Sequence, residues 1–265
     1  MNNVNQTLYI PLYGKAYVSR KGIILKDSKA EYIWDKEKFE LKGKSKSKWL
    51  AYYMGMRSAV FDSWANTRIN AVQKSNKSAV VIHIGCGMDS RVERIGCDCE
   101  WYDVDFPSVI EERKRYYEES SNYHMIKSDA REVEWLNSVP TDKHAIVIME
   151  GVTMYFQVSE LKKLLKAIST HFDKVSLLMD CYTDFAAKAS KYKNPINDVG
   201  VTEVVGIDNP HILEEDTGFK YLGERTMTPK SKVDELKGME KVVFRFVFGG
   251  AIARKMYRMY EFKKI

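Results

Sequence analysis

A pair of glycines at positions 85 and 87 is the first feature of this sequence that could do chemistry. Residues 79–84 form a short apolar run, typical of a buried parallel strand, and residues 92–95 have helical spacing. Glycine permits a sharp turn and the close approach of a ligand. The third glycine of a dinucleotide-binding loop is absent, because that position is Ser90. The loop Gly85-Cys86-Gly87 therefore indicates a nucleotide-like ligand without a pyrophosphate.

Two acids end the next strand-like run, residues 100–106, about twenty residues beyond the glycine loop. Asp103 and Asp105 are two positions apart, so they share one face of a strand. An acid at this place can accept hydrogen bonds from both hydroxyls of a ribose. We therefore expect at least one of the two to contact the ligand, and the alternative is a pair of solvated acids.

Polar residues also follow two later strand-like runs. Asp129 and Ala130 come after residues 123–127, where a carboxylate and a backbone N–H could bind the amino edge of adenine. The alternative is a helix N-cap, for which Asp129 is equally suited. Glu150 follows the apolar run 145–149, and a partly buried acid at that edge of the sheet needs a partner such as a ligand ammonium.

Together these segments resemble the leucine carboxyl methyltransferase family, which includes polyketide O-methyltransferases. Residues 85–91 match its G-x-G followed by D-[ST]-R, residues 104–107 its V-D-x-P, residues 129–131 its D-x-R, and residues 150–155 its E-G-V-x-x-Y. Four motifs in the family's order, over about residues 50–180, are far more specific than any one of them. The segments 11–16 and 24–31 look more like the polyketide branch than the branch that modifies proteins, and Arg57 with Asp62 matches an upstream pair.

The resemblance implies a class I methyltransferase that depends on S-adenosylmethionine (SAM). It implies that Arg57 holds the SAM carboxylate and that Glu150 lies beside the amino group. Gly85 would pack under the methionine portion, with Cys86 and Gly87 completing the loop.

At the nucleoside end, the resemblance implies that Asp105 binds the ribose and that Asp129 and Ala130 bind adenine. Tyr155 and Lys15 are expected in the acceptor pocket, as a hydroxyl and as a cation. We assign no catalytic residue, because a carboxylate acceptor is already ionised near neutral pH and needs no base. A hydroxyl acceptor would need one.

The expected reaction is therefore methyl transfer to a carboxylate, or a hydroxyl, oxygen of a small molecule such as a polyketide. One alternative within the class is a methyltransferase of protein C-terminal carboxyl groups. Others are a SAM-binding protein without catalysis and an NAD-dependent oxidoreductase, against which the missing third glycine argues.

Strands and helices must alternate to bring these residues together. Such alternation predicts a doubly wound α/β sheet, and the resemblance makes it a Rossmann-like sheet of seven mostly parallel strands. A reversed hairpin from residues 219–225 and 257–263 would form its edge. The other predicted strands are 79–84, 100–106, 123–127, 145–149 and 174–179, and the predicted helices around them are 92–95, 107–120, 159–172 and 239–256.

Residues 1–77 are expected to form an N-terminal helical lid, with helices at 30–39 and 49–72. Gly55 leaves open whether the second is one helix or two. Residues 78–265 would form the SAM-binding domain, with a substrate-shaping insertion at about 182–218.

Composition limits the class of protein and the compartment in which it acts. The chain has 265 residues, of which 45% are hydrophobic, and this suits one large α/β domain. No apolar run approaches the roughly 20 residues of a membrane helix, and no signal peptide is apparent, so we expect a cytoplasmic protein. The net charge is +6, but the lysine run at 42–48 is interpreted as a solvated loop, not a nucleic-acid arm. We expect no metal site and reduced thiols at Cys86, Cys97, Cys99 and Cys181.

Overall fold

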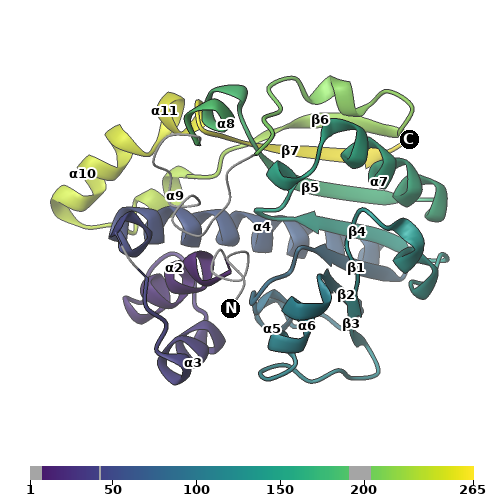
Figure 1. Ribbon diagram of the computed structural model, residues 1–265, viewed down its shortest axis with the longest axis horizontal. Helices are drawn as coiled ribbons and strands as arrows, with labels where there is room; N and C mark the ends of the chain where they lie inside the picture. Colours follow the sequence, from purple (N-terminus) through teal and green to yellow (C-terminus); the bar gives the residue numbers. More distant parts are fainter. Residues whose placement is uncertain (1–7, 42, 191–203) are drawn as a thin grey trace.

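The computed structural model describes residues 8–41, 43–190 and 204–265. Parts of the predicted lid (residues 1–7), lysine run (residue 42) and insertion (residues 191–203) lie outside these ranges. The described chain forms a seven-stranded sheet in the order β3-β2-β1-β4-β5-β7-β6 (Figure 1). Its strands are β1 (Ala79–Ile84), β2 (Glu100–Asp105), β3 (Tyr123–Lys127), β4 (His144–Met149), β5 (Val175–Tyr182), β6 (Phe219–Arg225) and β7 (Tyr257–Lys264).

The strand directions confirm the doubly wound fold. Strands β1 to β5 pair in parallel, while β7 lies antiparallel between β5 and β6. Every residue of β1 and β5 is buried, which explains their nearly continuous apolar sequence. Because β1, β2 and β4 are parallel, their carboxyl ends meet at one edge, and the loops that carry the predicted motifs follow these ends.

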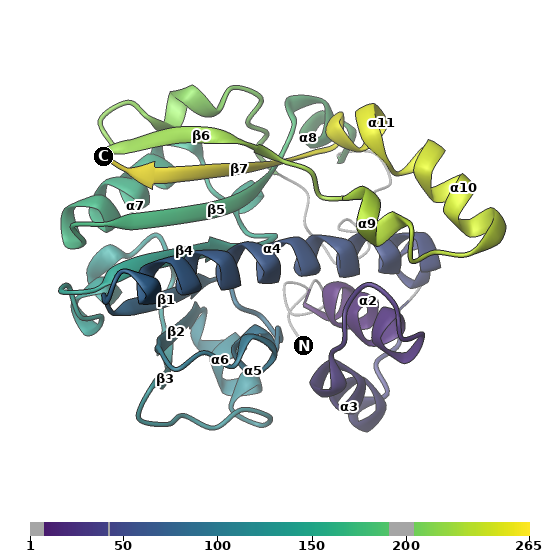
Figure 2. The same ribbon diagram turned by 180° about the vertical axis from the view of Figure 1, so that it is seen from behind.

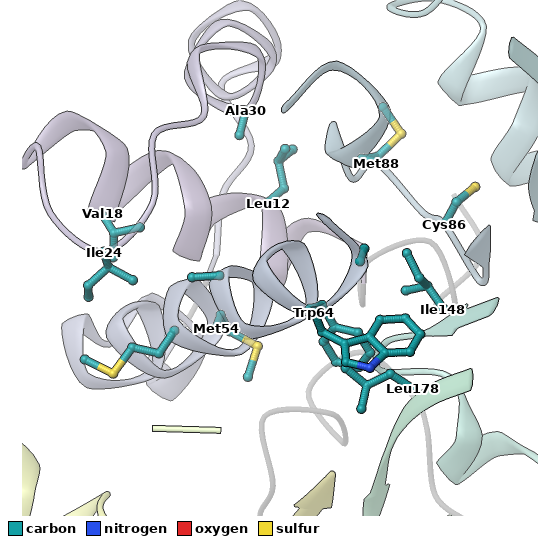
Figure 3. Packing of buried hydrophobic residues seen from close by; sticks show 14 of the residues in the cluster. Leu12, Val18, Ile24, Ala30, Met54, Trp64, Cys86, Met88, Ile148 and Leu178 are labelled. Carbon is teal, nitrogen blue, oxygen red and sulfur yellow. The ribbon is translucent and has the colours of Figure 1, made fainter. Parts of the chain in front are cut away.

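Helices cover both faces of the sheet (Figure 2). On one face, residues such as Ile148 and Leu178 pack against Trp64 of the long helix α4 (Lys48–Lys74), as Figure 3 shows. On the other face, Val147 and Leu177 pack against helix α7 (Val158–His171). The other described helices after β1 are α5 (Arg91–Ile95), α6 (Pro107–Arg113), α8 (Asp184–Ser190), α9 (Lys230–Val233), α10 (Gly238–Val247) and α11 (Gly250–Arg254). Short 3-10 helices are η1 (Gly43–Lys46), which precedes α4, and η2 (Val133–Ser138), η3 (Thr153–Tyr155) and η5 (Pro210–Leu213).

The N-terminal segment adds α2 (Tyr9–Arg20), which the periodicity did not single out, and α3 (Ser28–Glu37). Helix α4 runs unbroken through Gly55. A Cβ there would lie 2.7 Å from Cγ2 of Val18, so the glycine permits close packing of α2 on α4. The division of the chain at residue 77 stays a prediction, although α4 packs directly on β1, β4 and β5.

Three expectations need correction. The helix expected at 107–120 ends at Arg113, because the chain turns there and buries Tyr116 and Tyr117. The helix expected at 239–256 is divided into α10 and α11, since Gly250 adopts a positive φ of 58°. Cys97 and Cys99 form a disulfide and are not free thiols, because the turn between α5 and β2 brings their Cα atoms to 5.3 Å.

No helix among the described residues combines the length and the apolar character that crossing a membrane requires.

Candidate functional site

A cavity of about 380 Å³ lies at the carboxyl ends of β1, β2 and β4. Open α/β sheets bind ligands at this edge. The residues predicted for the cofactor and acceptor sites come from six separate segments, and the fold brings them to the wall of this one cavity: Lys15, Arg57, Gly85, Cys86, Gly87, Asp105, Asp129, Ala130, Glu150 and Tyr155.

The glycine loop is tightly enclosed. Gly85 has a φ of +69°, and a Cβ on it would lie 2.7 Å from Cγ2 of Val152. Gly87 also has a positive φ, and its N–H donates to Oδ2 of Asp105 at 2.8 Å. The loop therefore needs glycine both for its backbone and for its neighbours, and it is tied to the end of β2.

The two acids of β2 have different surroundings. Asp103 is buried away from the cavity lining, forms an ion pair with Nη2 of Arg113 at 2.5 Å and accepts a hydrogen bond from the hydroxyl of Tyr123 at 2.7 Å. Burial would raise the pKa of Asp103, but Arg113, His83 and Tyr123 together outweigh it and hold the pKa at about 2. Asp105 lines the cavity and accepts the backbone N–H groups of Gly87 and Phe106, both at 2.8 Å. Burial nevertheless raises the pKa of Asp105 to about 6.

Arg57 of α4 and Glu150, which follows β4, form a buried ion pair at the cavity. The Nε of Arg57 donates to Oε1 of Glu150 at 2.9 Å, and its Nη1 lies 3.3 Å from Oδ2 of Asp180. Glu150 also accepts from Ser58 at 2.9 Å and from the Nη2 of Arg91. Burial would raise the pKa of Glu150, but Arg91 and Arg57 together lower it to about 2. The acid is therefore ionised and already paired with two cations.

The residues directly after the glycine loop extend this network. Arg91 is fully buried and donates from Nε to Asp62 at 2.7 Å. Asp89 pairs with Arg94 at 2.8 Å and with Lys15 at 2.7 Å. Burial would raise the pKa of Asp89, but Arg91, Arg94 and Lys15 hold it well below its usual range. The ammonium of Lys15 thus ties α2 to the loop after β1, and its role toward an acceptor stays a prediction.

Asp129 and Ala130 lie at the opposite end of the cavity, after β3. Asp129 accepts the N–H of Arg131 at 3.0 Å and its Nε at 2.9 Å. The bond from Arg131 lowers the pKa of Asp129. Asp129 therefore closes a local turn. Tyr155, which follows β4 and is 39% exposed, also lines the cavity.

An apolar wall faces these charged groups, and sequence reasoning missed it. It consists of side chains from the start of the chain and from α4, together with Met154, Tyr182 and Tyr257: Leu8, Ile10, Pro11, Leu50 and Met54. Their only signal in the sequence was helical spacing, which a core residue shares with a pocket residue. Arg91 belongs to the D-[ST]-R motif but was given no role of its own, and Asp180, which directly follows the predicted strand 174–179, was not singled out.

The only histidine in the described lining is His83. Its Nε2 lies 3.0 Å from Nη1 of Arg91, and its Nδ1 lies 3.4 Å from Oδ1 of Asp103. Burial lowers the pKa of His83. The ring is held inside the network, so it is not placed to accept a proton from an acceptor.

Comparison with known sequences gives concordant matches. The sequence profile of the leucine carboxyl methyltransferase family matches residues 12–169. The tetracenomycin polyketide synthesis O-methyltransferase TcmP of Streptomyces glaucescens is 29% identical over 92% of this chain and 90% of its own length. The SAM-dependent methyltransferase dpfgK of Gibberella zeae is 29% identical over 57% of this chain and 56% of its own length.

Solved structures share the fold. A protein of Thermobifida fusca YX, described provisionally as a methyltransferase, has a TM-score of 0.55 at 13% identity and covers 95% of this chain and 93% of its own. Magnesium protoporphyrin IX methyltransferase of Synechocystis PCC 6803, with bound S-adenosylhomocysteine, has a TM-score of 0.51 at 10% identity over 90% of this chain and 95% of its own. At these identities the likeness shows the class I methyltransferase fold alone.

Proposed function

We propose that this chain, which belongs to the leucine carboxyl methyltransferase family, transfers a methyl group to a carboxylate oxygen of a small apolar molecule. The family and the two sequence relatives make the chain a SAM-dependent methyltransferase. What is proposed here is the acceptor and the residues that serve each ligand. The observation that carries the choice of acceptor is a cavity with an apolar wall and no placed base among its described lining residues.

The residues present fit SAM. The described lining contains four acids and three cations, so it has an excess of negative charge for a cationic ligand. Asp105 has a buried carboxylate for a ribose, and Arg57 retains one guanidinium nitrogen, Nη2, with no hydrogen-bond partner among the described residues. When bound, SAM supplies a methyl group on a positively charged sulfur. We propose that Arg57 holds the carboxylate of the methionine end and that Asp105 binds the ribose.

The other expected cofactor contacts belong to the same proposal. Gly85, Cys86 and Gly87 would lie along the ligand, Asp129 and Ala130 at adenine, and Glu150 near the amino group. Because Glu150 is already paired with Arg57 and Arg91, its contribution to that group would be long-range attraction as well as direct contact.

Methyl transfer to an oxygen requires an acceptor that is ionised or a base that ionises it. His83 is held by Arg91 and Asp103, and Glu150 is paired with two arginines. A carboxylate is ionised above about pH 5 without help. The acceptor oxygen would form its new bond to carbon as the carbon–sulfur bond breaks, and the enzyme would contribute alignment and exclusion of water.

The apolar wall supports a small organic acceptor. Leu50 and Met54 of α4, with Leu8, Ile10 and Pro11, present no charge to the cavity. Lys15 and Tyr155 are proposed as the polar groups of this acceptor pocket. The relative TcmP acts in polyketide synthesis by its name, and its 29% identity over most of this chain supports an acceptor of the polyketide type.

We also propose that the enzyme acts in the cytoplasm, on a small molecule and without a nucleic-acid or membrane partner.

The test begins with calorimetric titration of SAM and S-adenosylhomocysteine into the purified protein, with NAD as a control. Transfer from methyl-labelled SAM is then measured on polycyclic aromatic acids, each beside the matching primary amide and phenol. We expect label only in the acids. Mild alkali should release it as volatile methanol, because esters hydrolyse under conditions that leave methyl ethers intact.

Label that resists alkali would show a hydroxyl acceptor and overturn the carboxylate proposal. A peptide that ends in a leucine carboxylate is included among the acceptors. Methylation of the peptide, with none of the small acids, would favour the enzyme class that modifies protein C-termini. Absence of SAM binding would overturn the assignment of the cavity.

A further inference from the structure

Asp180 is a buried acid that none of the motifs includes. It lies near the end of β5, is 0% exposed and does not line the cavity. Its Oδ2 lies 3.3 Å from Nη1 of Arg57, and its Oδ1 accepts the N–H of Gly151 at 2.6 Å. One carboxylate thus joins the middle of α4 to the loop after β4, at the two places where the cavity would receive the methionine end of the ligand.

The three nitrogens of the Arg57 side chain have distinct surroundings. Nε is bound by Glu150 and Nη1 by Asp180, while Nη2 has no hydrogen-bond partner among the residues that the structure describes. A planar guanidinium that is held at two nitrogens has a fixed orientation. The third nitrogen is then presented to the cavity, which Arg57 lines, as a donor for a ligand carboxylate.

Glu150 alone would not fix this orientation. Its carboxylate is shared with Ser58 and with Arg91, which donates to Oε2. Only one bond, from Nε to Oε1, connects Glu150 to Arg57. Asp180 supplies the second point of attachment and, among the described residues, forms no ion pair with any other cation.

The same acid shapes the backbone against which Arg57 rests. Gly151 has a φ of +71°, and its N–H is held by Asp180. A Cβ on Gly151 would lie 3.1 Å from Nη2 of Arg57, so the guanidinium lies directly on this turn. The hydroxyl of Thr153 also donates to the backbone carbonyl of Asp180, which secures the loop to β5.

We infer that Asp180 is a positioning residue, which holds Arg57 and the turn at Gly151 in the geometry that binds the carboxylate of SAM. This inference rests on the proposed role of Arg57. It assigns to β5 a part in cofactor binding without direct contact. Its effect should therefore appear only for ligands that carry the amino-acid end.

The experiment compares ligands that differ in that end. Asp180→Asn keeps an oxygen for the N–H of Gly151 but places an uncharged amide beside Nη1. We expect the affinity for SAM and S-adenosylhomocysteine to fall about tenfold, because a charge-assisted contact becomes misaligned. The affinity for 5′-deoxy-5′-methylthioadenosine, which lacks the amino-acid end, should change less than about twofold.

Two further variants isolate the cause. In an Arg57→Ala background, Asp180→Asn should produce no additional loss of SAM affinity, because the two changes act through one contact. Glu261→Gln is the matched control, since Glu261 is also a buried acid and binds Arg68 and Arg225, but it does not line the cavity. It should leave both ligands at wild-type affinity.

Unchanged SAM affinity in Asp180→Asn, equal losses for both ligands, or additive losses with Arg57→Ala would each overturn the inference. Thermal unfolding identifies a variant that does not fold, and Asp180→Ser, which is smaller and retains an acceptor for Gly151, then replaces it with the same expected pattern. Failure of the wild-type protein to bind SAM would instead overturn the proposed function.

Discussion

The two sides of the cavity are built in opposite ways. On the strand side, at the carboxyl ends of the strands, charged groups are buried and linked: Glu150 after β4 pairs with Arg57 of α4 and with Arg91 of α5, and several ion pairs of this network are shorter than 3 Å. On the helix side, Leu50 and Met54 contribute only apolar surface. Ion pairs fix positions but need matched partners, whereas apolar packing tolerates substitution of similar volume. The comparison predicts that a substitution on the strand side abolishes SAM binding, while a substitution on the helix side alters only the binding of the acceptor.

The largest expected effect comes from Gly85→Val. The new side chain would clash with Val152, whose Cγ2 is 2.7 Å from the Cβ position. The valine would also have to adopt a backbone φ of +69°. We expect SAM binding to fall below calorimetric detection, with the circular dichroism spectrum retained. Gly250→Val is the matched control, because its φ is also positive, at 58°, but no atom lies within 4 Å of its Cβ position. SAM bound normally by Gly85→Val would contradict the role of the loop.

The next effect concerns the ribose. Asp105→Ala should weaken SAM and methylthioadenosine equally, by about 1–3 kcal/mol, because both ligands carry the hydroxyls that a carboxylate would accept. Competition binding measures the two losses. The equality is the informative result, since a change near Arg57 should separate these ligands. A loss for SAM alone would move Asp105 from the ribose to the other end of the ligand.

Acid should weaken the same contact. The pKa of Asp105 in the free protein is raised to about 6 by burial. Ribose hydroxyls donate more strongly to the ionised form, so SAM binding should favour loss of this proton. At pH 5 about one molecule in ten is ionised, and the affinity should be lower than at pH 8 by up to about tenfold. Calorimetry in buffers of different ionisation enthalpy should detect a proton released near pH 6.

Other acids must be separated from this effect. The pKa values of Asp103 and Glu150 are lowered to about 2, so neither titrates between pH 5 and 8. Burial raises the pKa of Asp180, with Arg57 opposing it. Asp105→Asn therefore serves as the control: its affinity for SAM should be low and nearly independent of pH. A wild-type slope that persists in this variant would assign the proton to another group.

The strand side was predictable because chemistry and topology agree there. Asp105 and Glu150 each follow an apolar run, and parallel strands bring such ends to one edge. The sequence did not predict which charged residues form ion pairs with one another. The one-dimensional pattern does not show that Asp103 turns to Arg113, or that Asp180 reaches Arg57 from a strand 123 residues later.

The helix side was not predictable in the same way. Leu50 and Met54 have the spacing of any core-facing helix residue, and only the packing of α2 on α4 leaves them at the cavity. Helix α2 itself escaped notice because its buried face contains Gly14 and Lys15 among its apolar residues. The burial of Lys15 is explained by its ion pair with Asp89, which is 74 positions away in the sequence.

The smallest expected effect is the one that separates the two sides. Leu50→Ala removes apolar surface from the wall without touching an ion pair of the described network. SAM affinity should change less than about twofold, since no charged contact is lost. Once an acid substrate is found, its KM should rise several-fold while kcat changes less, because truncation removes binding that is common to ground and transition states. A large loss of SAM affinity would show that the apolar wall contacts the cofactor, and the division of the cavity into two independent sides would be wrong.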